Sequence, residues 1–175
     1  CHRNGWSGVS GYTNNSTINP TLRNLTIANN GDAGDAPERR AGIYWNQHNV
    51  NSDLENLNLT GNVGTAMLWY CNGSITGRNL TATGNGQNEL TLPGCTVGGG
   101  RQWDLGDAGI PTRVTGSIDI GANGLLSIQP GTTLRFDKRA DGWSYGLYVP
   151  DKAALYALGT AAKPSAASRQ SAPSG

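Results

Sequence analysis

Charged side chains of both signs gather in one short stretch, residues 31–41, with the sequence GDAGDAPERRA. Carboxylate and guanidinium groups are the residue types that can move protons or hold a charged ligand. The weak catalytic candidates in this stretch are Asp32, Asp35, Glu38, Arg39 and Arg40. The stretch has the character of an inserted loop, and loops on a rigid scaffold often carry binding residues. A solvated loop with no chemistry is the simpler interpretation.

Aromatic residues follow this loop and recur one repeat later. Residues 42–45 (GIYW) align with residues 66–69 (AMLW), which places Trp45 over Trp69. Stacked aromatic side chains on an exposed β face form a platform for sugar rings, because the apolar faces of sugars pack on π surfaces. Aromatic ladders inside a core are at least as common, so spacing alone leaves both interpretations open.

Side-chain alternation favours the tyrosines as the exposed set. Successive side chains of a strand point to opposite faces. Ile43 and Met67 are the expected core residues, and the two tryptophans share their face. We therefore expect a glycan-binding surface at Tyr44, Tyr70 and His48, beside the charged loop.

Metal-site and phosphate-loop motifs are missing from the sequence. The two histidines, His2 and His48, have no spacing that suggests a metal site, and neither CxxC nor HxxxH occurs. Gly5-Trp6-Ser7-Gly8 fails the Gly-x-Ser-x-Gly pattern of serine hydrolases, and there is no phosphate-binding glycine loop. The net charge of +1 gives no field to attract nucleic acid or an anionic membrane. No apolar run reaches the roughly 18 residues of a membrane span. We expect no metal, no nucleic acid partner and no membrane span.

Two of the three cysteines have the spacing of the repeat described below. Cys71 and Cys95 are 24 residues apart (95−71) and should lie on adjacent turns of the chain. That position falls within the roughly 4.4–6.8 Å Cα separation that a disulfide accepts. The sequence predicts either a disulfide between them or two packed thiols, with Cys1 left over.

A short phrase occurs three times along the chain. It reads NLTI with a following NG from Asn24, NLNL with NVG from Asn56, and NLTA with NG from Asn79. The copies start 32 and 23 residues apart (56−24 and 79−56), and the longer interval contains the charged loop. Repeats of this length are typical of stacked architectures, in which no single unit can bury its own apolar face.

Each copy predicts a strand and a turn. A short alternating run indicates a strand, and Asn-Gly marks a corner that needs positive φ. No segment of helical length or period separates these strands, so we expect an all-β chain. At the roughly 4.8 Å spacing of neighbouring strands, equivalent Asn residues would form a ladder of amide hydrogen bonds. This pattern resembles the right-handed parallel β-helix, a solenoid, of the pectin-lyase-like superfamily and of bacterial secreted β-helix repeat proteins.

The resemblance covers the fold and the style of the repeat. In pectin-lyase-like enzymes, carboxylates hold calcium or protonate a glycosidic oxygen, and Arg or Lys abstracts a proton or neutralises charge. In this chain the acidic and basic residues stand in one loop instead of on successive turns. The paired-Asp motifs of polygalacturonases and the calcium-binding acidic set of pectate lyases are both missing.

By pattern the chain divides into four parts. Residues 1–97 carry the repeats with the Asn ladder, and residues 98–112 have the composition of a Gly-rich linker. Residues 113–163, with LSIQPGTTLRF, GLYV and LYALGTAAKP, resemble the opening turns of a second, bacterial surface β-helix. Residues 164–175 predict a disordered tail. We thus expect a β-helix segment interrupted near 96–112, and the alternative is one continuous helix with an irregular turn there.

For function, we expect a non-catalytic segment of a secreted or surface bacterial β-helix protein that binds polysaccharide or cell-surface glycan. The alternative is a fragment of a polysaccharide lyase or glycoside hydrolase acting on uronate-containing polysaccharide. A lyase would call for calcium, and we expect no other cofactor. An ice-binding or adhesive surface would need flat ranks of threonine, which the repeats do not provide. The sequence starts at Cys1 without an apolar leader, so we expect the export signal to lie outside it.

Overall fold

The computed structural model of the chain describes residues 3–12, 16–46, 50–70, 73–97, 102–106 and 109–169. Over these ranges regular structure is almost entirely strand, and the one helix, α1 (Pro37–Arg40), has four residues. Every ladder that joins two named strands in this part of the chain is parallel. The all-β prediction is confirmed, and so is the parallel pairing of Leu25 with Leu57.

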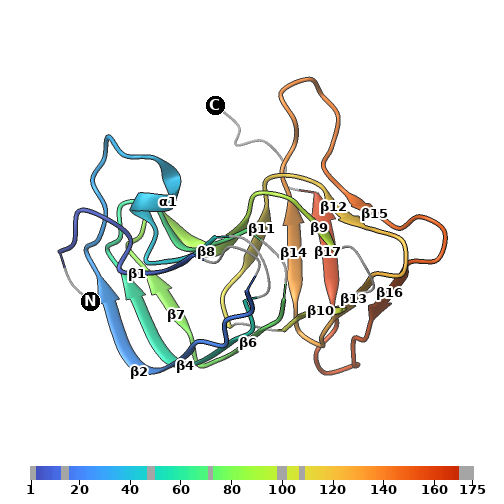
Figure 1. Cartoon of the computed structure of the whole chain (residues 1–175), viewed down its shortest axis with the longest axis horizontal. Coiled ribbons are helices and arrows are strands. Elements are labelled where there is room, and N and C mark those ends of the chain that lie inside the picture. The colour runs from blue at the N-terminus through green and yellow to red at the C-terminus, as the bar shows by residue number, and fades with distance from the viewer. Residues whose placement is uncertain are drawn as a thin grey trace.

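The strands form three sheets (Figure 1). In spatial order, sheet 1 contains β1 (Val9–Tyr12), β3 (Ile43–Asn46), β5 (Thr65–Trp69), β8 (Gln87–Leu92), β11 (Thr112–Val114), β14 (Thr133–Phe136) and β17 (Ala166–Arg169). Sheet 2 contains β16 (Ala154–Ala157), β13 (Leu125–Ile128), β10 (Gln102–Leu105), β6 (Ile75–Arg78), β4 (Ser52–Thr60) and β2 (Thr21–Ala28), with β7 (Thr81–Thr83) also paired to β4. Sheet 3 contains β15 (Leu147–Tyr148), β12 (Ile118–Ile120) and β9 (Cys95–Val97).

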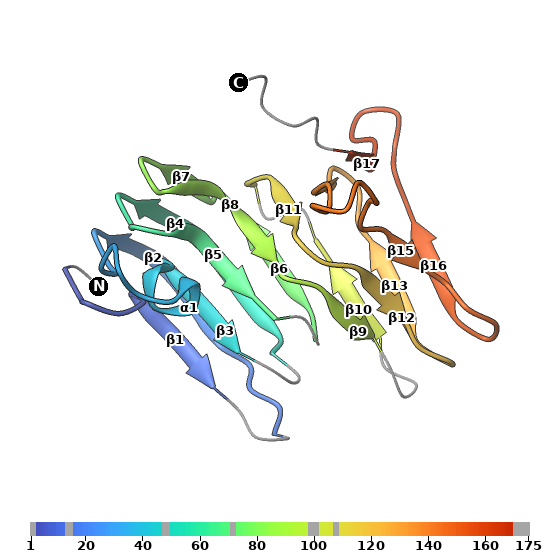
Figure 2. The ribbon, with the colours of Figure 1, turned by 90° about the horizontal axis from the view of Figure 1, so that it is seen from above.

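The order in which the chain visits these sheets is regular. From β8 onward it passes through sheet 1, sheet 3 and sheet 2 in rotation, so each turn adds one strand to each sheet. Before β8 the chain passes back and forth between sheets 1 and 2, with β6 and β7 both in sheet 2, and among the described residues sheet 3 begins at β9. Figure 2 shows the successive turns side by side, from blue at the N-terminal end to red at the C-terminal end.

The first asparagine of each repeat forms a ladder on the surface. Asn24, Asn56 and Asn79 all have positive φ, at 55°, 52° and 56°, the left-handed conformation that Asn tolerates better than most residues. The Nδ2 of Asn56 donates to the Oδ1 of Asn24 at 2.9 Å, and the Nδ2 of Asn79 donates to the Oδ1 of Asn56 at 3.0 Å. The predicted amide ladder is therefore confirmed.

The second asparagine of each repeat forms a buried ladder. Asn30, Asn62 and Asn85 are at most 9% exposed. The Nδ2 of Asn30 donates to the Oδ1 of Asn62 at 2.9 Å, and the Nδ2 of Asn62 donates to the Oδ1 of Asn85 at 2.8 Å. The Nδ2 of Asn62 also donates to the carbonyl of Ile27 at 3.1 Å. These bonds satisfy amides that would be costly to bury alone.

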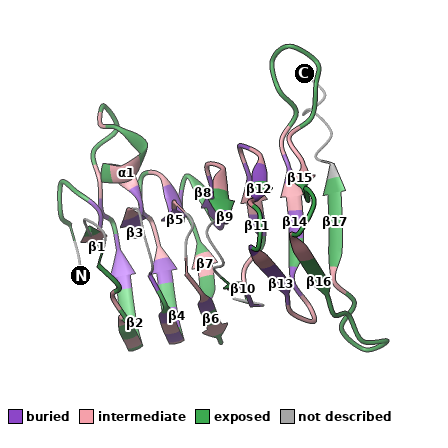
Figure 3. Ribbon diagram, turned by 45° about the vertical axis from the view of Figure 1, so that its right-hand side comes forward, coloured by how far each residue is buried: buried purple, intermediate pink, exposed green. Residues whose placement is uncertain are grey.

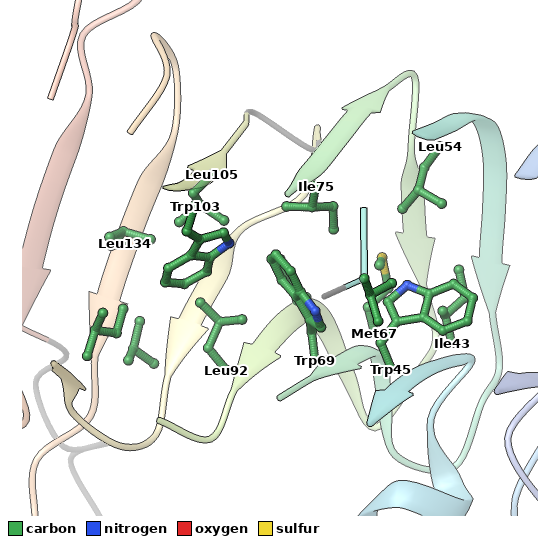
Figure 4. Packing of buried hydrophobic residues seen from close by; sticks show 14 of the residues in the cluster. Ile43, Trp45, Leu54, Met67, Trp69, Ile75, Leu92, Trp103, Leu105 and Leu134 are labelled. Atoms are coloured by element: carbon green, nitrogen blue, oxygen red, sulfur yellow. The ribbon is translucent and has the colours of Figure 1, made fainter. Parts of the chain in front are cut away.

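The interior between the sheets is filled by aliphatic side chains and three tryptophans (Figure 4). Trp69 from sheet 1 and Trp103 from sheet 2 meet edge to face, with ring centroids 5.3 Å apart. The indole Nε1 atoms of Trp45, Trp69 and Trp103 are buried without a hydrogen-bond partner. Figure 3 shows that burial falls toward the C-terminal turns, where β16 and β17 are largely exposed.

The predicted linker, residues 98–112, contains a strand of the stack. Within it, β10 pairs with β6 on one side and β13 on the other. Trp103 and Leu105 are both fully buried and alternate with polar residues, which is the pattern of a half-buried strand. In the sequence, the glycines on either side of this short run give the segment the composition of a linker, so the strand was not predicted. Sheets 1 and 2 therefore run through the expected interruption near 96–112.

The expected tail also begins with a strand. Residues 166–169 form β17, which pairs with β14 in register from Thr133 to Phe136. Alanine and serine backbones can complete a ladder on an exposed edge even though they add little apolar surface. Residues 170–175 lie outside the described part of the chain.

Candidate functional site

The outer face of sheet 1 holds the predicted aromatic residues. The inward set of β3 and β5 is Ile43, Trp45, Met67 and Trp69, each at most 3% exposed. Because side chains alternate along a strand, Tyr44 and Leu68 point outward, and they pair in register. The inward placement of both tryptophans is confirmed.

Three tyrosines follow one another on this outer face. The rings of Tyr44 and Tyr70 lie edge to face, with centroids 6.1 Å apart. Partial burial, followed by the nearby Tyr70 and Glu38, raises the pKa of Tyr44 to about 12. Partial burial and then Glu38 also raise the pKa of Tyr70. Tyr12, on β1, is 65% exposed and close enough to Tyr44 to add to its pKa shift.

Sequence reasoning missed Tyr12, although a signal for it was present. In the run VSGY at residues 9–12, Val9 and Gly11 share one face of a strand and Ser10 and Tyr12 share the other. In the structure Val9 pairs with Ile43, so Ser10 and Tyr12 fall on the outer face. Recognising β1 as another strand of the same sheet would have placed Tyr12 on the same face as Tyr44, opposite Asn46.

A groove continues from the tyrosines across sheet 1. Leu68 and Thr91 pair in register and point outward, yet they are only 3% and 7% exposed. Helix α1 stands against β5 and forms one wall. The groove has a volume of about 450 Å³. It is lined by Pro37, Arg40, Val63, Gly64, Thr65, Leu68, Tyr70, Gly86, Gln87, Thr91, Pro93, Arg113 and Thr115.

The charged residues that line this groove are two arginines. The Nε of Arg40 is buried without a hydrogen-bond partner. Arg113 donates to Asp137 from Nε to Oδ1 at 2.8 Å and to Oδ2 at 3.1 Å, and from Nη2 to Oδ2 at 2.7 Å. Glu89, at 8% exposed, accepts from Arg113 at 3.4 Å and from Arg135 at 2.9 Å. The hydrogen bond that Arg113 donates to Asp137 is the main cause that raises the pKa of Arg113.

The other charged residues of the loop at 31–41 do not line the groove. Asp35 pairs with Arg39 at 3.7 Å, and the Arg39 guanidinium lies 4.2 Å above the ring of Trp6. Asp32 is exposed, and Glu38 contributes to the site only through its charge near the tyrosines. The structure therefore brings Arg40 into the groove with Tyr70 and places Glu38 near the tyrosines, whereas Asp32, Asp35 and Arg39 do not line the groove.

A second charged cluster lies on the outer face of sheet 2. Arg23 and Asp53 are 2.6 Å apart, and Arg78 and Glu55 are 2.9 Å apart. Arg23 also lies 3.5 Å from Glu55, and Arg78 lies 3.6 Å from Asp53, so each arginine contacts both carboxylates. A hydrogen bond from Arg23 lowers the pKa of Asp53, and one from Arg78 lowers the pKa of Glu55. Because each charge is balanced within the set, this cluster stabilises the stack without leaving a charge for a ligand.

Two predicted residues cannot be placed, because His48 and Cys71 lie outside the described part of the chain. Cys95 is disulfide-bonded, and its pairing with Cys71 stays a prediction. Among the described residues, no group of three or more His, Cys, Asp or Glu side chains is arranged to hold a metal ion.

No protein-family model, curated protein or solved structure matches this chain. Across the described ranges, none of the helices has the length and apolar character needed to cross a bilayer.

Proposed function

We propose that this chain is a segment of a right-handed parallel β-helix. Two features support this proposal: the rotation of the chain through three parallel sheets, and the Asn ladders that join successive turns. Connections between parallel strands are right-handed in nearly all proteins, which supports the handedness.

The outer face of sheet 1 is proposed to bind a glycan. The observation that carries this is a continuous strip that begins with Tyr12, Tyr44 and Tyr70 and continues into the groove beside α1. Tyrosine offers an apolar ring for a sugar face and a hydroxyl for its polar edge. From β1 to β11 the strip crosses four strand spacings, roughly 19 Å at about 4.8 Å each. That length suits several units of a linear polysaccharide.

Binding without turnover is the activity we favour. Among the described residues that line the groove, the ionisable side chains are Arg40, Arg113 and Tyr70, and none is a carboxylate. Glu89 and Asp137 are engaged by arginines, and Glu38 lies near Tyr44 and Tyr70 without lining the groove. A glycoside hydrolase would need two carboxyl groups within reach of the sugar.

We also propose that the chain acts outside the cell or on the cell surface. The disulfide at Cys95 supports it, because disulfides form and persist in oxidising compartments such as the cell exterior.

The test is affinity electrophoresis of the chain through gels that contain neutral or uronate-containing polysaccharides, with and without calcium. The Tyr44→Ala/Tyr70→Ala variant should lose retardation while keeping its melting temperature. The matched control is Tyr148→Ala/Tyr156→Ala, which removes two tyrosines that are each 54% exposed on other sheets. Retardation that disappears equally in both variants, or in neither, would overturn the site. Release of reducing ends from any polysaccharide would favour the enzyme alternative.

A further inference from the structure

The connection between β14 and β15 is an insertion at one corner of the stack. The two preceding turns cross from sheet 1 to sheet 3 in a few residues, at 93–94 between β8 and β9 and at 115–117 between β11 and β12. The next turn uses residues 137–146 for the same crossing. The strands on either side of this loop pair in parallel with those of the turn before. The extra residues therefore leave the sheets, and the pairing of the strands does not need them.

The loop at 137–146 is held in one conformation by its own bonds. An antiparallel bridge joins Lys138 to Ser144. The backbone N–H of Arg139 donates to the carbonyl of Trp143 at 2.8 Å, and the backbone N–H of Trp143 donates to the Oδ1 of Asp141 at 3.1 Å. Arg139 and Asp141 also form an ion pair at 2.8 Å. Trp143 is nonetheless 76% exposed, the largest value among the large hydrophobic residues that the structure describes. The loop therefore presents its indole to solvent in a preorganised position.

The first residue of this loop is joined to the groove on sheet 1. Asp137 accepts hydrogen bonds from Arg113, which lines the groove. Pro93 and Thr115, the first residues of the two shorter crossings, also line it. The groove thus extends from the insertion at 31–41, through α1, to the corner at which the second insertion stands one turn further on. Figure 1 shows this second loop, in orange, rising on the same side of the stack as α1.

The same loop contains the spacing of a serine nucleophile. Residues 142–146 (GWSYG) have the form Gly-x-Ser-x-Gly, which in serine hydrolases places the serine on a strand-to-helix turn. Here Ser144 lies opposite Lys138 in the bridge, and the strand β15 follows the loop instead of a helix. The loop does not have the geometry of a nucleophile elbow, and its exposed indole is the feature that calls for a ligand.

A sugar ring is the ligand that suits this indole. The C–H face of a sugar packs on an aromatic ring, and one indole is large enough to cover one sugar. The neighbours Gly142 and Ser144 are small, and Tyr145 packs against the core. Trp143 is thus a single apolar ring among polar groups, without the broad apolar patch that a protein partner or a bilayer would need.

We propose that Trp143 is a further binding residue for the glycan, stacking on a sugar ring beyond the groove. This inference rests on the function proposed for the outer face of sheet 1. From β1 to β14 the extended site crosses five strand spacings, roughly 24 Å at about 4.8 Å each. The ligand is therefore a long polysaccharide chain. Fragments that reach only the tyrosines and the groove do not gain the contact with Trp143.

The experiment compares the affinities of variants for long and short fragments of a polysaccharide that retards the wild-type chain in gels. Trp143→Ala should weaken the binding of long fragments by about fivefold or more and leave the binding of short fragments unchanged. Trp143→Tyr keeps an aromatic ring and should restore most of the affinity. The matched control is Tyr156→Ala, which removes an aromatic side chain that is 54% exposed on sheet 2 and should bind like the wild type.

Acrylamide quenching of fluorescence adds a readout that a merely structural role would not change. Of the five tryptophans, Trp45, Trp69 and Trp103 are at most 3% exposed. In a Trp6→Phe background, Trp143 is then the one exposed indole of the chain. Long fragments should protect it from acrylamide, whereas short fragments should not. Quenching that long fragments leave unchanged overturns the contact.

The remaining outcomes separate this inference from the proposed function. If Tyr44→Ala/Tyr70→Ala loses binding while Trp143→Ala binds long fragments like the wild type, the role of Trp143 is overturned and the proposed function stands. A wild-type chain that no polysaccharide retards overturns both. Co-sedimentation of the chain with vesicles of phosphatidylcholine and phosphatidylserine, lost in Trp143→Ala while glycan affinity is unchanged, assigns the indole to a bilayer and overturns its role in glycan binding.

Discussion

Aromatic residues that are adjacent in sequence, in β3 and at the end of β5, lie in opposite environments: the tryptophans are buried and the tyrosines face outward. Trp45 and Trp69 fill the interior at 3% and 0% exposure, whereas Tyr44 and Tyr70 lie half-buried on the outer face. One register shift along either strand would exchange the two pairs. The glycan proposal therefore rests on the register of sheet 1.

Truncation of the interior tryptophan should be costly. Trp69→Ala removes a fully buried ring that contacts Trp103, so we expect a loss of roughly 3–5 kcal/mol in the free energy of unfolding. Urea denaturation measures this loss. The control Trp143→Ala removes a ring that is 76% exposed and should change stability by less than about 0.5 kcal/mol. Similar losses in both variants would mean that Trp69 is not a core residue.

The stability of the chain should fall in alkali partly because of Tyr44. Its pKa in the folded chain is about 12, against about 10 when unfolded. Between these values the unfolded state loses the phenolic proton first, so folding becomes less favourable as the pH rises from 10 to 12. The Tyr44→Phe variant should show a smaller fall over this window in denaturation series at increasing pH. An identical fall in both proteins would show that Tyr44 titrates alike in the folded and unfolded states.

For single residues, the sequence correctly predicted the face of the strand wherever side-chain alternation alone decides it. It placed Tyr44, Tyr70 and the two tryptophans on the correct faces, because a period of two needs no knowledge of distant partners. It did not find Arg113 as a groove residue, because that role depends on β11 lying beside β8. Pairing between strands about 20 residues apart leaves no local signal.

At the scale of elements, the buried Asn ladder fixes how one turn lies on the next. Asn62 stands at its centre, bonded to Asn30 on one side and Asn85 on the other. Repetition of the phrase NLxxxxNG predicted this ladder, since equivalent residues of stacked turns must meet.

Removal of the central amide should destabilise the stack. Asn62→Ala removes the acceptor of the buried backbone N–H and Nδ2 of Asn30 and the donor to the carbonyl of Ile27, while the Oδ1 of Asn85 keeps the bond from the backbone N–H of residue 62. We therefore expect a loss of about 3 kcal/mol in the free energy of unfolding. The control Asn56→Gly breaks the exposed ladder while keeping the positive φ, and should cost much less. Thermal and urea denaturation measure both. A loss at Asn56 as large as at Asn62 would contradict the assigned burial.

For residues 98–112, amino-acid composition predicted the structure less well than side-chain alternation did. The glycines at 98–100 suggested a linker, but the alternation in QWDL at 102–105 carries the actual signal for β10. A short strand next to glycines is ambiguous until its partners are known, and β6 and β13 supply them.

In the molecule as a whole, sheets 1 and 2 run through the described part of the chain from one end to the other, and sheet 3 joins them from β9 onward. Amide hydrogen exchange should therefore find β10 as protected as its neighbours, since it is paired on both sides. The amides of β16 and β17 should exchange faster, because these strands are paired on one side and largely exposed. Fast exchange at residues 102–105 would instead indicate two separate segments joined by a linker.

Backbone NMR shift mapping is the direct test of glycan binding on the outer face of sheet 1. The chain is titrated with oligosaccharides prepared from whichever polysaccharide retards it in gels. We expect the shifted amides to cluster at Tyr12, Tyr44, Thr91 and Arg113 and in residues 68–70, along the strip and groove. Shifts that cluster on the outer faces of sheets 2 or 3, with this strip unchanged, would contradict it.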